Sequence, residues 1–440
     1  MKSSKVLGAL VTLGLAAAVA TPAMALENQF SGSYTGFYDL SNYSAVGNDG
    51  DSTFPRTDGK PKHDNVTGLL KNAPTENYFV QRVRLGYTAK ASEDVKLVTK
   101  FEFDYNYIGN SSYAVGRGSG GALGADSVNM ETKNLYLDLN VARGLNAKIG
   151  MQGYNDAFKG IIFDADMAGI LLSHENDKAS FTAGLFRFVD ANTTTLGKQT
   201  VDMISLDGKL NITKSTKVGA AYYYITNDID PNAVKLHTIG LNAEAAAGPV
   251  TLTGFALAQF GDTGVINKKT DAKGYAFNLG AKIPVGAGTA RAELLYVPGG
   301  KNALSVVSNE GGAFYDNEMI ILSRDKNATS IDNAIVFDVN NYGQGIIFAS
   351  VGFDFPLTAK LSGSVNVGAA EVAKDSVKKH DSKYLGTEVN CEANYKFTPA
   401  VTFGVRAGYV VLGDYFKNAD LTGKTPDDPY DVKLIAKYSF

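Results

Sequence analysis

The stretch VKLVTKFEFDYNY, residues 95–107, decides the fold class of this chain. Its odd-numbered positions are apolar or aromatic except for Thr99, and its even-numbered positions carry charges or an amide except for Val98. Successive side chains of a β-strand point to opposite faces, so this stretch is predicted to form a strand with one apolar and one polar face. The last residues, 430–440, repeat the pattern.

The same alternation recurs from one end of the chain to the other. Matching to a two-residue period identifies about 18 strands. Besides the two segments above, they lie at 29–41, 77–90, 129–141, 144–154, 166–174, 179–190, 199–211, 215–227, 236–247, 249–260, 273–284, 288–297, 345–356, 358–370, 383–396 and 399–412. The stretch 298–344 leaves room for two more short strands, for example at 334–339, so the predicted range is roughly 16–20 strands.

The connections between these strands alternate in length. Short ones fall near 91–94, 142–143, 175–178, 212–214, 248, 285–287, 356–357 and 397–398. Long ones fall at 42–76, 108–128, 155–165, 191–198, 228–235, 261–272, 298–344, 371–382 and 413–427. Up-and-down membrane barrels have tight periplasmic turns, longer outside loops and an even strand number, so the alternation predicts that topology.

The polarity of the strands does not suit a water-soluble sheet protein. Alternating strands over this length would need a very large apolar core, and their polar faces carry Arg, Lys, Asp and Glu in mid-strand. Burying such charges without partners costs on the order of several kcal/mol per ion. The conflict disappears if the apolar faces contact lipid, the polar faces line a wet lumen and the sheet closes on itself. The predicted fold is therefore all-β, a transmembrane antiparallel up-and-down β-barrel forming one domain over residues 26–440.

The first 25 residues have the pattern of a cleaved secretory signal peptide. Lys2 and Lys5 precede an apolar run at 6–20, and Ala23 and Ala25 form an A-x-A cleavage site. The alternative is a membrane anchor, which is disfavoured because the run is shorter than the roughly 20 residues of a spanning helix. No later apolar run is long enough for such a helix, so export past the inner membrane is expected.

Charge and cysteine content disfavour several classes of protein. Without the two signal-peptide lysines the chain has 40 basic and 45 acidic residues, a mild balance that argues against a nucleic-acid partner. Cys391 is the only cysteine, so no internal disulfide and no cysteine-based haem or metal site is predicted. The four histidines show no metal-ligand spacing, and no metal or cofactor is expected. The G-x-G-x-x-G match at 116–121 lies in a polar loop without the strand and helix that would give it meaning.

Taken together, these features resemble the outer-membrane porins of Gram-negative bacteria over essentially the whole chain after residue 25. The most specific element is the terminal Phe440, which ends an alternating strand. The resemblance implies that Tyr438 and Phe440 are the signal read by the barrel-assembly machinery, and that small hydrophilic solutes or ions pass through. It also implies surroundings of outer-membrane lipid and lipopolysaccharide, and it leaves a homotrimer open.

The predicted strand number is similar to that of the larger, substrate-preferring porins. In those proteins one or more loops fold into the lumen and narrow it. Here the third outside loop, 155–165, is short, and 298–344 is the longest. Which loop narrows the lumen therefore stays open at this point.

Strand parity assigns the charged side chains that would line the pore. The basic ones are Arg82, Arg84, Lys96, Lys100, Lys148, Arg291, Arg406, Lys433 and Lys437. The acidic ones are Glu102, Asp104, Asp138, Asp207, Glu244, Glu293, Asp354, Glu388 and Glu392. Strand order groups most of the basic residues in an arc across the barrel seam, and charged linings of this kind select ions or orient polar solutes. The hypothesis is a weakly selective channel that favours anions near the arc; the alternative is that these charges only pair with cross-strand neighbours.

Two other functions stay open. A structural or interaction barrel would use the loops 42–76, 108–128 and 298–344 for adhesion or for docking an envelope partner. A barrel hydrolase would need a Ser–His–acid site around His174 or His237, but no serine motif accompanies either one, so an enzyme is not expected. A plugged transporter and an autotransporter are disfavoured because no plug or passenger domain precedes the first strand.

Overall fold

The computed structural model describes residues 26–43, 69, 71–107, 110–111, 119–120, 130–190, 200–229, 234–265, 268–305, 314–327, 334–375, 380–419 and 423–440. The predicted signal peptide, residues 1–25, lies outside these ranges, as do parts of several long loops. No helix in the described ranges is long and apolar enough to cross a membrane.

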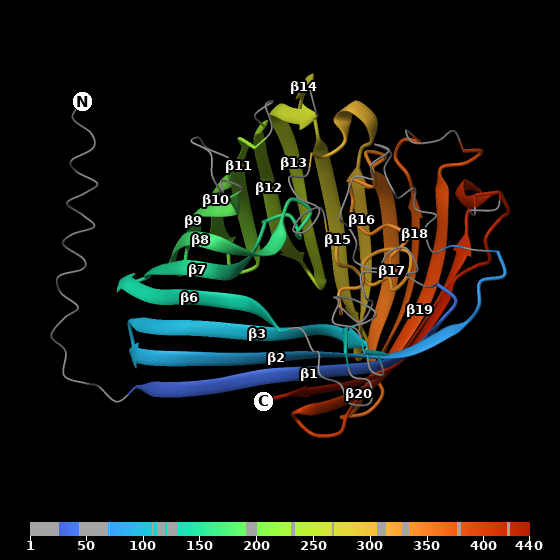
Figure 1. Cartoon of the computed structure of the whole chain (residues 1–440), viewed down its shortest axis with the longest axis horizontal. Coiled ribbons are helices and arrows are strands. Elements are labelled where there is room, and N and C mark those ends of the chain that lie inside the picture. Colours follow the sequence, from blue (N-terminus) through green and yellow to red (C-terminus); the bar gives the residue numbers. More distant parts are fainter. Residues whose placement is uncertain are drawn as a thin grey trace.

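Eighteen long antiparallel strands form one closed sheet around a lumen (Figure 1). They are β1 (Glu27–Ser41), β2 (Glu76–Ser92), β3 (Val95–Tyr107), β6 (Glu131–Ala142), β7 (Leu145–Asn155), β8 (Asp164–Glu175), β9 (Ala179–Asp190), β10 (Thr200–Thr213), β11 (Thr216–Asn227), β12 (Val234–Ala247), β13 (Val250–Val265), β15 (Tyr275–Val285), β16 (Gly288–Val297), β17 (Ile346–Pro356), β18 (Leu361–Glu371), β19 (Tyr384–Lys396), β20 (Val401–Leu412) and β21 (Tyr430–Ser439). Each pairs with the next along the chain. The predicted all-β, up-and-down barrel is confirmed.

The barrel closes where β1 meets β21. The two strands pair in register from Ser33 opposite Ser439 to Ser41 opposite Asp431. Beyond that ladder the N–H of Phe440 donates to the carbonyl of Gly32 at 3.1 Å, and the N–H of Gly32 donates to the carbonyl of Phe440 at 3.0 Å. The last residue of the chain is therefore part of the seam.

Three short strands in the described ranges lie outside this pattern. β14 (Lys268–Asp271) prolongs the hairpin at the end of β13, and β4 (Asn110–Ser111) pairs only with β5 (Ser119–Gly120). Pairings this short cover too few positions to show a period in the sequence. The further strand suggested at 334–339 is wrong, because that segment contributes a single bridge from Val336 to Ser323.

The two ends of the barrel differ as the connection lengths predicted. At one end, called the turn end below, consecutive strands are joined by tight turns such as those between β12 and β13 and between β15 and β16. Gly248 and Gly286 occupy these turns with φ of +62° and +60°, a conformation open mainly to glycine. The other end, called the loop end, carries every long connection.

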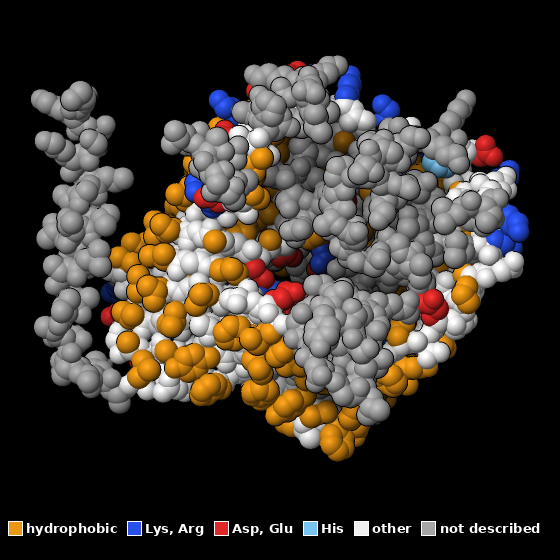
Figure 2. All heavy atoms as spheres, viewed as in Figure 1, with side chains coloured by type: hydrophobic (Ala, Val, Ile, Leu, Met, Phe, Trp, Pro, Cys, Tyr) orange, Lys and Arg blue, Asp and Glu red, His pale blue; other side chains and the backbone are white. Residues whose placement is uncertain are grey.

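The outer face of the barrel is apolar. On β12, Ile239 and Leu241 point outward and are 51% and 61% exposed, whereas the alternate residues Thr238 and Gly240 are buried. Figure 2 shows apolar side chains spread over the outer surface and charged side chains in the hollow at the centre. An exposed apolar band of this kind is what a strand presents to lipid.

The apolar core lies inside the barrel, toward the loop end. Inward side chains of the wall, such as Tyr223 and Phe255, pack against Phe158 of a loop that enters the lumen, with ring centroids 5.9 and 5.6 Å apart. Strand parity predicts polar inner faces that line a wet lumen. The loop-end part of the inner wall is apolar because inserted loops cover it and exclude water, which strand parity alone does not reveal.

Candidate functional site

A short loop between β7 and β8 folds into the lumen around one carboxylate. Asp156 is buried, and its Oδ1 accepts hydrogen bonds from the backbone N–H groups of Phe158 at 2.6 Å and Gly160 at 3.0 Å. Its Oδ2 accepts from the N–H groups of Ile162 at 2.6 Å and Phe163 at 2.8 Å. Burial raises the pKa of Asp156 to about 6, although the four N–H groups oppose that shift.

This loop places a cation against the opposite wall. Lys159 pairs with Glu293 of β16. Glu293 also accepts a hydrogen bond from Asn278 of β15 at 3.0 Å, and Asn278 lies 3.3 Å from the hydroxyl of Tyr315. Two loops and two wall strands therefore meet at one polar cluster in the lumen.

A second segment, residues 314–327 of the longest loop, also lies in the lumen and is called the luminal insert below. Glu388 of β19 is fully buried, and its carboxylate accepts hydrogen bonds from the N–H groups of Ile320 at 2.7 Å, Ile321 at 2.9 Å and Leu322 at 2.7 Å. Hydrogen bonds to a charged acceptor are about twice as strong as neutral ones. Glu388 therefore fastens the luminal insert to the inner wall.

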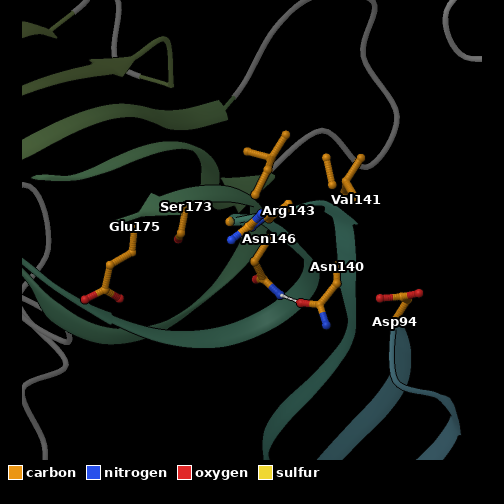
Figure 3. Close-up of a pocket in the computed structure, with 10 residues that line it drawn as sticks. Asp94, Asn140, Val141, Arg143, Asn146, Ser173 and Glu175 are labelled. Carbon is orange, nitrogen blue, oxygen red and sulfur yellow. Dashed lines mark hydrogen bonds between the residues drawn. The ribbon is translucent and has the colours of Figure 1, made fainter. Parts of the chain in front are cut away.

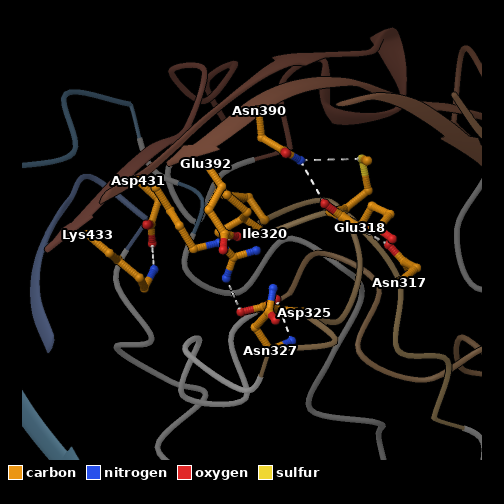
Figure 4. Close-up of polar contacts among 12 residues, drawn as sticks. Asn317, Glu318, Ile320, Asp325, Asn327, Asn390, Glu392, Asp431 and Lys433 are labelled. Atoms are coloured by element: carbon orange, nitrogen blue, oxygen red, sulfur yellow. Dashed lines mark hydrogen bonds and ion pairs between the residues drawn. The ribbon is translucent and has the colours of Figure 1, made fainter. Parts of the chain in front are cut away.

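Neighbouring wall residues extend this attachment (Figure 4). Asn390 donates to the carbonyl oxygen of Glu318 at 2.9 Å and to Glu388 at 2.7 Å. The carboxylate of Glu318 pairs with Arg291 of β16 at 2.7 Å, and Arg291 pairs in turn with Asp354 of β17 at 2.6 Å. One connected network thus runs from β16 to β19 through the insert.

Arg406 of β20 holds the other end of the luminal insert. Its Nη1 donates to the buried carboxylate of Asp325 at 2.5 Å, and its Nε lies 2.8 Å from Glu392 of β19. A buried guanidinium with two carboxylate partners is held in one orientation, since both charges would otherwise be left without solvent or a partner. The insert is therefore pinned at both ends of its buried stretch.

On β2, two residues of the predicted basic arc share one carboxylate, which offsets part of their charge. Arg82 and Arg84 both pair with Glu102 of β3, the first at 3.0 Å. Glu102 is buried, and the ammonium of Lys133 lies 3.8 Å from it. Arg84 stands directly opposite Glu102 in the strand register, so this is a cross-strand pairing.

Lys433 at the seam is paired in the same way. Its ammonium contacts Asp431 on its own strand and lies 3.0 Å from Asp39 of β1. Asp39 also accepts a hydrogen bond from the hydroxyl of Tyr78 at 3.0 Å. These contacts link β21, β1 and β2 inside the lumen.

Four predicted basic residues differ from the others. Lys96, Lys100, Lys148 and Lys437 have no carboxylate within 4.0 Å of the ammonium in the described part of the chain. The Lys148 ammonium lies 5.5 Å from the centre of the Tyr136 ring. All four ammonium groups are therefore free of ion pairs with the described wall.

The remaining predicted acids have mixed partners. Asp138 accepts a hydrogen bond from an asparagine of the next strand at 2.5 Å, and Asp207 accepts one from Tyr223 at 2.5 Å. Glu244 lies 3.6 Å from a cross-strand lysine. The side chain of Asp104 lies outside the described residues.

The sequence did not predict the luminal residues that the loops contribute. Lys159, Tyr315, Glu318 and Asp325 lie in segments without a two-residue period, so strand parity assigns them no face. One signal was available: the run Met-Ile-Ile-Leu at 319–322 is too apolar for a solvated loop. Such a run inside a long loop indicates a buried segment.

Neither histidine considered for a hydrolase has a serine partner among the described residues. His237 accepts or donates a hydrogen bond with Tyr222 at 2.8 Å and stacks on Phe260 on the outer face. The His174 ring forms a hydrogen bond with Asn176 at 3.3 Å. In the described ranges no group of three or more His, Cys, Asp and Glu side chains is placed to hold a metal ion.

An open cavity of about 680 Å³ lies at the turn end of the wall (Figure 3). It is lined by residues of β6, β7, β8, the turn before β3 and the turn between β6 and β7; the polar ones include Asp94, Asn140, Arg143, Asn146 and Glu175. Asn146 donates to Asn140 at 3.2 Å. The cavity is separate from the luminal insert, since the two share no lining residue.

A closed antiparallel barrel with an apolar outer face and a charged interior defines the class of transmembrane β-barrels. Among solved structures the chain is similar to the Pseudomonas aeruginosa outer-membrane porins OpdL and OpdQ, with TM-scores of 0.58 and 0.56. Sequence identity is 12% in both cases, and the alignments cover 94% of this chain and 99% of each porin. OccK8 (OprE) of the same organism has a TM-score of 0.56 at 11% identity, covering 94% of this chain and 98% of that one.

The likeness to the larger porins is thereby confirmed at the level of fold. No protein-family model matches the sequence. No curated protein matches it either.

Proposed function

We propose that this chain is an outer-membrane porin, a water-filled channel for passive diffusion of small hydrophilic solutes or ions. The observation that carries the proposal is the closed 18-stranded wall, apolar outside and charged inside. A barrel of roughly 16–18 strands is wide enough to leave an aqueous channel. The similarity to solved porin structures supports the same class, and diffusion through a pore requires no catalytic residue.

We propose that the channel is weakly selective for anions. Arg82 and Arg84 share the carboxylate of Glu102. Arg291, Arg406 and Lys433 each face two carboxylates, so these five residues together add no surplus of positive charge. The proposed selectivity for anions comes instead from the lysines without ion pairs to the described wall, namely Lys96, Lys100, Lys148 and Lys437. A surplus of one sign along a water-filled passage raises the local concentration of the opposite ion.

The first prediction concerns conduction and its sign. Purified protein in a planar bilayer is expected to give discrete current steps. Under a KCl gradient, the reversal potential is expected to have the sign of an anion-selective channel. Replacing Lys96, Lys100 and Lys148 by alanine should move that potential toward cations, because the free luminal charge falls. A matched control removes Lys273, Lys301 and Lys417 from the loops and should leave the potential unchanged.

Two outcomes of that experiment contradict the proposal separately. A correctly folded barrel that passes no current would contradict the channel itself. Current steps with a clear cation preference would contradict only the anion selectivity, and the free lysines would then have another role.

We propose that the two chain termini direct export and assembly, and that the outer face determines what surrounds the barrel. Cleavage after Ala25 would give a protein beginning at Leu26, and Tyr438 with Phe440 would be read by the barrel-assembly machinery. The apolar outer face would contact lipid and lipopolysaccharide, or further copies in a homotrimer. N-terminal sequencing of the outer-membrane fraction and the mass of the detergent-solubilised protein test these points.

A further inference from the structure

The inner wall is shaped to receive the luminal insert. A Cβ added at Gly368 of β18 would lie 2.5 Å from the sulfur of Met319, and one added at Gly408 of β20 would lie 3.5 Å from the Cβ of Ile320. Met319 and Ile320 are both buried. The wall therefore lacks side chains at the two points where the insert brings large ones.

The polar contacts of this seat are made mainly to the backbone of the insert. Glu388 accepts from three consecutive N–H groups, those of residues 320–322, and Asn390 donates to the carbonyl of Glu318. Backbone contacts hold a segment in place whatever its side chains are. The side chains Glu318 and Lys326, which pair with each other, are left partly exposed to the lumen.

We propose that Glu388 is the positioning residue that keeps the luminal insert seated, aided by Asn390 and Arg406, and that this seating sets the bore of the channel. The proposal rests on the proposed channel function. Its physical basis is the buried carboxylate, the only charged acceptor that the described wall offers to the three N–H groups. Weakening that acceptor leaves the N–H groups underbonded, so the unseated state becomes more populated and the passage widens.

Thiol labelling measures seating without any need for conduction. The native Cys391 is exposed and is first replaced by alanine. Ile320→Cys then places a thiol at a position that is 1% exposed, so a water-soluble reagent reaches it only when the insert leaves its seat. Adding Glu388→Gln should speed labelling about tenfold, the effect of weakening one charge-assisted hydrogen bond. Val389→Ala, on the outer face of the same strand, is the matched control and should leave the rate unchanged.

A disulfide tests whether seating sets the bore. Ile320→Cys with Gly408→Cys places two Cβ atoms at the separation a disulfide needs, about 3.5–4.5 Å. Glu388→Gln alone should increase the time spent in a higher-conductance state about tenfold, in proportion to the unseated population. The oxidised disulfide should return that barrel to wild-type conductance, and reduction should reverse the effect. A residue that only stabilised the barrel would not be rescued in this way.

The outcomes separate the two proposals. The positioning role of Glu388 is overturned if a folded barrel is labelled at the same rate with Glu and with Gln at position 388. It is also overturned if the disulfide does not form. A silent wild-type barrel overturns the channel, while the labelling ratio still reports on the seat. If Glu388→Gln does not fold, the disulfide is made with Glu388 in place, and identical current fluctuations in its oxidised and reduced forms overturn the inference.

Discussion

Two buried carboxylates, Asp156 and Glu388, each hold a luminal segment by its backbone N–H groups. The chain has one cysteine and so cannot fix these segments with disulfides. A carboxylate carries two oxygens with several acceptor sites, so one side chain satisfies three or four N–H groups that would otherwise be buried without partners. At the scale of residues, the interior is therefore ordered by hydrogen bonds from backbone N–H groups to buried carboxyl groups.

Asp156→Asn is expected to loosen the loop that enters the lumen after β7. Asparagine keeps one oxygen but turns an NH₂ group toward two N–H donors, and each N–H left unbonded costs about 1–3 kcal/mol. Limited proteolysis of the folded barrel should cut the variant faster within residues 156–163. Asp177→Asn, in an exposed turn, is the control, and an uncut Asp156→Asn loop would contradict this account.

The same aspartate predicts a pH dependence. Because burial raises its pKa to about 6, above the unfolded value near 3.9, the folded loop binds a proton more readily than the unfolded one. The resulting stabilisation is fully present below about pH 4 and is lost as the pH rises through about 6. Resistance of the loop to an acid-tolerant protease should therefore fall between pH 4 and pH 7. Asp156→Asn should show a flat profile; a wild-type loop that becomes more resistant over this range would contradict the sign.

At the scale of elements, each strand is a boundary between lipid and lumen. Leu241 lies near the middle of β12 and points outward, whereas its neighbour Asn242 points inward. A one-residue step along a strand therefore changes the surroundings of a side chain completely. Substitutions at two adjacent positions of one strand therefore test the lipid-facing side and the luminal side separately.

Leu241→Arg is expected to destabilise the barrel by about 2–4 kcal/mol, the cost of placing an arginine on the lipid face near the bilayer midplane. Asn242→Arg should have a much smaller effect, because a guanidinium on the inner face keeps its hydration. Urea unfolding in lipid vesicles, followed by tyrosine fluorescence, measures both. Equal losses for the two variants would mean that the outer face of β12 does not contact lipid.

At the scale of the whole molecule, closure depends on one seam between strands at opposite ends of the chain. A Cβ at Gly32 would lie 2.5 Å from the ring of Phe440 and 2.9 Å from the backbone oxygen of Arg84. A side chain at that position would therefore displace the terminal ring and press on the backbone of the neighbouring strand. Glycine lets the terminal residue complete the wall without that displacement.

Gly32→Val is expected to prevent closure and to abolish the compact, heat-modifiable form that folded barrels show in gel electrophoresis. Gly208→Val is the matched control, since a Cβ at Gly208 of β10 meets nothing within 4 Å. Both variants have the same substitution in a strand, so β-propensity is equal. A normal folded fraction for Gly32→Val would show that the seam tolerates rearrangement.

The sequence by itself determined the strands, their order, their two faces and the alternation of turns and loops. It did so because a strand repeats every two residues and each strand pairs with the next, so local pattern and global topology carry the same information. It also placed Arg84 and Glu102 on the same face, although not in contact. Phe440 was identified only through the resemblance to porins.

Only the tertiary structure decided what fills the lumen. Lys159 and Glu293 are 134 residues apart, and Arg406 and Asp325 are 81 apart. No periodicity links a loop residue to the wall it reaches, because loop conformation depends on contacts that exist only once the barrel has closed. For that reason strand parity predicted polar inner faces and a basic arc but not their partners, whereas in the described part of the folded chain carboxylates pair with Arg82, Arg84, Arg291 and Arg406 and an apolar insert packs against the inner wall.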